Sequence, residues 1–171
     1  PTDRFCSTCG LPLGVAQADA GAATDALGAY EEPEPGGADA APAARELAAR
    51  SGFEVAPFGP GWRLLVPLHL DRRQAVYVGP AGTDAEGRAV LSLVSVCGPA
   101  NERDARTLLK LNARTVEGHC AIRVLRGEEY FVVTRTLVAG AVDPVDAAGL
   151  VGRIARDADG LEERLSRGRD I

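Results

Sequence analysis

The chain has 171 residues, of which 46% are hydrophobic and 25% are charged, so it can form one or two small domains with a substantial core. Its formal net charge is -5, from 19 basic and 24 acidic residues, and no apolar run is long enough for a transmembrane helix. This composition argues against a membrane protein and, because no basic field exists to hold a phosphate backbone, against nucleic-acid binding.

The chain opens with a short cysteine-bearing head, residues 1–13. Cys6 and Cys9 form a C-x-x-C pair that Gly10 follows directly. A glycine there supplies the positive φ that the turn around a metal often needs, and the backbone N–H groups of such a turn donate to the thiolates. The head therefore predicts half of a zinc ribbon, with Cys6 and Cys9 as zinc ligands.

Two other interpretations of the head stay open. A redox pair needs its first cysteine at a helix N-terminus, and Gly10 and Pro12 disfavour a helix here. The other interpretation is a pair of idle thiols on a flexible tail. A structural zinc also needs two more ligands. They would come from a second protomer, from a different protein, or from Cys97 and Cys120, although lone strand cysteines are more often small core residues.

Residues 14–42 form a tract of Ala, Gly, Pro and acidic residues. Between Gly10 and Pro42 there are six acidic residues and no basic one. Few large apolar side chains are available for burial, which predicts a disordered linker. Dense, periodic hydrophobicity runs from Ala43 to Leu165, so residues 43–171 are expected to form the folded domain.

The first half of the domain predicts a helix followed by strands. Residues 42–52 suggest a short helix, with Pro42 in its first turn and Gly52 just past its end. The extended segments that follow are a short run at 53–59, a strand at 62–70 in which Pro67 suggests an edge position, a strand at 72–79 ended by the turn cluster 79–87, and a mostly buried strand at 88–98.

The second half predicts two helices with a hairpin between them. Asn101 is a good N-cap for a helix at 101–113. Residues 119–127 and 128–140 predict a hairpin around Gly127, because both segments are rich in β-branched and aromatic residues. A long helix should open near Asp143. The residues that share a helix face are Ala105, Leu108, Leu109 and Asn112 in the first helix, and Val151, Ile154, Ala155, Ala158, Leu161 and Leu165 in the second.

This order, α-β-β-β-α-β-β-α, predicts an α+β fold with an antiparallel sheet and its helices on one face. It resembles the type III secretion chaperone-like fold, including its YbjN-type branch. The likeness is carried by "SLVSVCGPANERDARTLLKLNA", "IRVLRGEEYFVVTRTLV" and "LVGRIARDADGLEERL", with Asn112 and Asp159 as the polar positions. It covers about Ala43–Leu165. The resemblance implies a small, non-enzymatic, often homodimeric protein that holds a partner polypeptide along exposed apolar grooves.

No catalytic constellation is visible in the sequence. His119 and Cys120 are adjacent in a predicted strand, so they point to opposite faces and do not form a nucleophile–base pair. His69 has no obvious ligand set, and the acidic pairs, Glu162–Glu163 among them, are interpreted as solvated charge. We therefore expect no enzymatic activity.

The apolar strands carry more hydrophobic residues than one buried face needs. Trp62, Leu64 and Val66 should share one face, which is either core or a seam for a second protomer or a partner segment. Leu108 and Leu109 are the other candidates for partner or dimer contacts.

These patterns predict a cytoplasmic, non-enzymatic adaptor or chaperone-like module that binds a protein partner as a homodimer, without nucleic acid or membrane. The cytoplasmic prediction follows from the low cysteine count and from the lack of a visible secretory signal. The alternative is a structural subunit of a larger multi-protein assembly, in which the C-x-x-C head makes a metal-linked contact.

Overall fold

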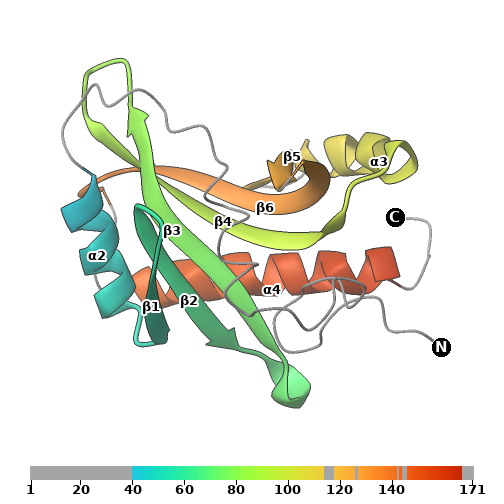
Figure 1. Cartoon of the computed structure of the whole chain (residues 1–171), viewed down its shortest axis with the longest axis horizontal. Coiled ribbons are helices and arrows are strands. Elements are labelled where there is room, and N and C mark those ends of the chain that lie inside the picture. Colours follow the sequence, from blue (N-terminus) through green and yellow to red (C-terminus); the bar gives the residue numbers. More distant parts are fainter. Residues whose placement is uncertain (1–39, 114–117, 126, 142, 144–145, 167–171) are drawn as a thin grey trace.

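The structure, a computed structural model, describes residues 40–113, 118–125, 127–141, 143 and 146–166. This part of the chain forms a six-stranded antiparallel sheet and three α-helices, which confirms the predicted α+β class and element order (Figure 1). The elements are α2 (Ala41–Arg50), β1 (Glu54–Phe58), β2 (Gly61–Pro67), β3 (Arg73–Thr83), β4 (Ala89–Pro99), α3 (Glu102–Asn112), β5 (His119–Leu125), β6 (Glu128–Val138) and α4 (Ala147–Ser166).

The strands lie in the order β1-β2-β3-β4-β6-β5, and every neighbouring pair is antiparallel. The short extended run predicted at 53–59 forms the edge strand β1. The edge position that Pro67 suggested for β2 is wrong, because β2 lies between β1 and β3. Pro67 is tolerated there because it is the last residue of the strand, where it is paired with Arg73.

The predicted end of β3 at residue 79 is also wrong. β3 continues through the glycines and proline of the turn cluster to Thr83, and a register shift between Pro80 and Thr83 absorbs the irregular residues as a bulge. The turn follows at Asp84, whose Oδ1 accepts hydrogen bonds from the backbone N–H groups of Glu86 (3.0 Å) and Arg88 (2.8 Å). An aspartate that binds the backbone ahead of it is a common turn signal.

One hydrophobic core lies between the sheet and the helices. α4 lies across the sheet and α2 lies beside the β1–β2 end (Figure 1). The helical spacing predicted for α4 is confirmed, because Val151, Ile154, Ala155, Ala158 and Leu161 are all buried. Leu108 of α3 belongs to the same core cluster, so all three helices contribute to it.

Among the described residues, none of the helices combines the length and the apolar character needed to cross a membrane.

Candidate functional site

Helix α3 is fastened to the outer edge of β5. Asn101 caps the helix as predicted, with its Oδ1 accepting from the backbone N–H of Asp104 at 2.9 Å. At the other end, the Asn112 amide donates to the Cys120 carbonyl (2.8 Å) and accepts from the Cys120 N–H (2.7 Å). β5 is the last strand of the sheet in the described residues, so this amide occupies the place of a strand partner and provides hydrogen bonds for one residue of that edge.

Three large apolar side chains stay exposed on these two adjoining elements. Leu109 on α3 is 69% exposed, and Ile122 and Val124 on β5 are 45% and 57% exposed. Ile122 and Val124 are two residues apart, so they project from the same face of the strand. We call Leu109, Ile122 and Val124 the edge ridge. β-Branched residues at the open edge of a sheet are suited to pairing with another polypeptide.

Leu108 and Leu109, which were predicted to share one face of α3, differ in exposure, because Leu108 is buried and Leu109 is 69% exposed. Leu108, which is 3% exposed, and Asn112 are four residues apart and form the face that contacts the rest of the domain. Leu109 is turned about 100° from Leu108 around the helix axis, which takes it out to the surface. Of the two leucines predicted to make partner contacts, only Leu109 is therefore accessible.

The strand candidates lie in the core. Trp62, Leu64 and Val66 do share one face of β2, as expected. That face is covered by the helices: Leu64 is 0% and Val66 is 2% exposed, and Trp62 is half-buried against the core. In this structure Leu64 and Val66 are therefore inaccessible to a partner.

Cys97 and Cys120 lie on strands that are not adjacent, although the charge of Cys120 still acts on Cys97. They lie on β4 and β5, which β6 separates in the sheet. Cys97 is fully buried, and its Sγ lies 3.7 Å from the carbonyl oxygen of Ser95, to which it donates. Burial raises the pKa of the Cys120 thiol, and burial together with the charge of Cys120 raises the pKa of the Cys97 thiol well above its usual value.

Across the described part of the chain, no group of three or more His, Cys, Asp or Glu residues is placed to hold a metal ion. Cys6 and Cys9 lie outside the described residues, as does the predicted linker up to residue 39.

A polar cluster that the sequence did not predict lies between α4 and the turn before β3. Arg72 donates from Nη2 to Oδ2 of Asp159 at 2.6 Å. Glu162 lies three residues beyond Asp159 on the same helix face. Burial, followed by the charge of Asp159, raises the pKa of Glu162 to about 7, although Arg72 acts in the opposite direction. The interpretation of Glu162 as solvated charge is therefore wrong.

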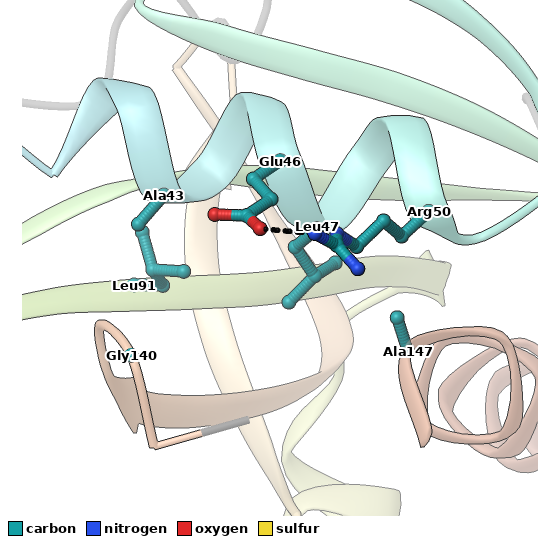
Figure 2. A pocket seen from close by; sticks show the side chains of 7 residues that line it. All are labelled: Ala43, Glu46, Leu47, Arg50, Leu91, Gly140 and Ala147. Carbon is teal, nitrogen blue, oxygen red and sulfur yellow. Dashed lines mark ion pairs between the residues drawn. The ribbon is translucent and has the colours of Figure 1, made fainter. Parts of the chain in front are cut away.

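A cavity of about 220 Å3 lies elsewhere, between α2, β4 and the start of α4 (Figure 2). Its walls are mostly apolar, and its ionisable lining residues, Glu46 and Arg50, form an exposed ion pair with each other at 2.9 Å. No serine, cysteine or histidine is among its lining residues. This arrangement suits an apolar group better than it suits catalysis. The lining residues are Ala43, Glu46, Leu47, Arg50, Leu91, Gly140 and Ala147.

Replacing Asn112 with alanine is expected to lower the free energy of unfolding by about 1–3 kcal/mol, because Cys120 would lose both backbone partners at a half-buried edge. Chemical denaturation of the full chain measures this change. Thr136→Ala, at an exposed strand position, is the control and should change stability by about 0.5 kcal/mol at most. Equal stability of Asn112→Ala and wild type would contradict the assigned role of this amide.

A scan against protein-family models and a search of curated proteins found no match to this chain. The family resemblance accordingly stays a prediction from the sequence pattern, and the function is inferred from the site itself.

Proposed function

We propose that the protein is a non-enzymatic, chaperone-like adaptor that holds a partner polypeptide and works as a homodimer. The observation that supports this function best is the edge ridge, Leu109, Ile122 and Val124, exposed on α3 and β5. Its residues would be buried by pairing with another chain, and burial of apolar surface is the main driving force of protein association.

The contrast between the two sheet edges supports an interface at β5. The opposite edge strand, β1, carries Pro57, which has no N–H to offer, and the charged Glu54, which pairs with Arg73 at 3.5 Å. Both features discourage strand pairing. On β5, the Asn112 amide satisfies only Cys120, and the exposed Ile122 and Val124 follow it along the strand.

A second copy of the chain can use this same surface. A two-fold dimer brings one patch against its own copy, and an antiparallel arrangement of two β5 strands has this symmetry. A continuous sheet would then cross the interface, with the edge ridge of each protomer contacting that of the other.

The experiment that tests the proposal is light scattering of the full chain with and without Val124→Glu. Wild type should be a dimer, and the variant should have a dissociation constant raised by about 100-fold or more, because each interface would gain two like charges in a desolvated centre. Thr136→Glu adds the same charge at an exposed site on β6 and should remain a dimer. A monomeric wild type, or an unchanged dimer in Val124→Glu, would contradict the proposal.

Zinc binding by Cys6 and Cys9 belongs to the same proposal. A homodimer would supply two C-x-x-C pairs and thus the four ligands of a structural site, without Cys97 or Cys120. Metal analysis after purification without chelator should give one zinc per two chains. Cys6→Ser should lose the metal and Cys97→Ser should keep it. The assignment would be overturned if wild type bound one zinc per chain and Cys120→Ser lost it. It would also be overturned if wild type contained no metal.

A further inference from the structure

The end of the sheet next to Arg72 is joined partly by side chains. β3 pairs with β4 over Tyr77–Thr83, whereas its first residues pair with β2. Near this end, the buried Gln74 donates from Nε2 to the carbonyl of Val96 (2.9 Å) and to Oγ of Ser95 (3.0 Å). Hydrogen bonds from the Gln74 side chain therefore take the place of backbone pairing between β3 and β4 at this end of the sheet.

A strained turn positions Arg72 at this end. Leu70 and Asp71 have φ values of 60° and 57°, a left-handed conformation that residues other than glycine rarely adopt. The backbone N–H of Leu68 donates to the Arg72 carbonyl at 2.8 Å and closes the turn. The Arg72 side chain then spans to Asp159, and its Nε is buried without a hydrogen-bond partner in the structure. Residues 68–72 are hereafter the β2–β3 turn.

One arginine faces two carboxyl groups in this cluster. Asp159 and Glu162 are three residues apart and lie on the same side of α4. Burial raises the pKa of both groups, each carboxylate is disfavoured by acidic neighbours, and Arg72 lowers both pKa values. The charge of Glu163 raises the pKa of Asp159, and the charge of Asp159 raises the pKa of Glu162. From β4, the buried thiol of Cys97 also faces Glu162, and it stays neutral because its pKa is raised.

We propose that Arg72, Asp159 and Glu162 form a proton-operated latch that fastens the C-terminal half of α4 to the β2–β3 turn. When Glu162 is protonated, the pair of carboxyl groups carries one negative charge, which Arg72 balances at 2.6 Å from Asp159. When Glu162 releases its proton to solvent, a second negative charge is half-buried, and Arg72 is the cation that acts on both carboxylates among the described residues. The helix end then opens more often, because opening returns that carboxylate to water.

The direction of the pH effect follows from linkage. The ordinary pKa of a glutamate is 4.5, and that of Glu162 in the folded chain is about 7. The folded state therefore binds more protons than the open state between these values. The stabilisation is complete below about pH 4.5 and is lost as the pH rises to about 7. The latch closes on acidification and loosens above neutral pH.

Hydrogen exchange of the full chain, corrected for the intrinsic rate at each pH, tests the latch. Amides at 159–165 should be roughly three- to tenfold less protected at pH 8 than at pH 6, after allowance for solvent screening at a partly exposed group. Glu162→Gln should keep the same protection at both pH values. The matched control is Glu163→Gln, which removes a charge from the next residue and should still show the loss at high pH.

The proposal is overturned if wild-type protection at 159–165 is the same at both pH values, or if Glu162→Gln loses protection as wild type does. A carbon NMR titration of the Glu162 carboxyl gives an independent reading that needs no variant. A midpoint near 7 supports the latch. A midpoint near the ordinary value of 4.5 contradicts it.

Discussion

Replacing Phe131 with alanine is expected to lower the free energy of unfolding by about 3–5 kcal/mol. Phe131 is 1% exposed and is among the largest fully buried side chains. It lies on β6 opposite Gly98 of β4 and Ile122 of β5, and it belongs to the core cluster that also contains the buried residues of α4. Its removal would leave a cavity that neighbours held in two strand ladders cannot fill by collapse. Urea denaturation measures this loss of free energy of unfolding. The dependence of that free energy on urea concentration should be compared between variant and wild type.

Thr136→Ala on the same strand is the control for Phe131→Ala, because its side chain is exposed. It should change stability by about 0.5 kcal/mol at most. A Phe131→Ala chain that unfolds within about 1 kcal/mol of wild type would show that this residue does not pack as the structure has it.

Replacing Gly61 with alanine is expected to lower the free energy of unfolding by a similar amount, for a different reason. A Cβ at Gly61 would lie far inside van der Waals contact of backbone atoms of the neighbouring strand β3, namely the Val78 carbonyl oxygen and the Gly79 Cα. A strand backbone cannot move aside as a flexible side chain can, so β2 would have to separate from β3 at the start of its ladder. We expect a loss of about 3 kcal/mol or more, which is the range of severe backbone and packing defects.

The matched control is Gly160→Ala, where an added Cβ meets no atom within 4 Å. Gly160 lies within α4, so alanine there should stabilise the chain by about 0.5–1 kcal/mol. Thermal unfolding of both variants should therefore move the midpoint in opposite directions. If Gly61→Ala unfolds at or above the wild-type midpoint, the close approach of β2 and β3 is not as described.

Features set by near neighbours in the sequence were predictable. The cap at Asn101 and the buried face of α4 depend on residues one to four positions apart, and both are confirmed. The hairpin around Gly127 also depends on near neighbours, and it is confirmed. Gly127 has the positive φ that the turn requires.

Features set by strand order were not predictable. Pro67 looked like an edge residue because the sequence does not show that β1 pairs outside β2. Glu162 looked solvated because Arg72 and Cys97, which face it, are far away in the chain. The edge ridge was found only in part, since the exposure of Ile122 and Val124 depends on β5 being the last strand of the sheet.

The most direct measurement of the proposed interface is hydrogen exchange of the full chain at protein concentrations well below and well above the dimer dissociation constant. The account predicts that amides of β5 beyond Cys120, together with those of α3 near Leu109, become more protected as the concentration rises, while β1 does not change. Two results would contradict the proposed interface. One is exchange at β5 that does not depend on concentration in a chain that dimerises. The other is protection that depends on concentration at β1 alone.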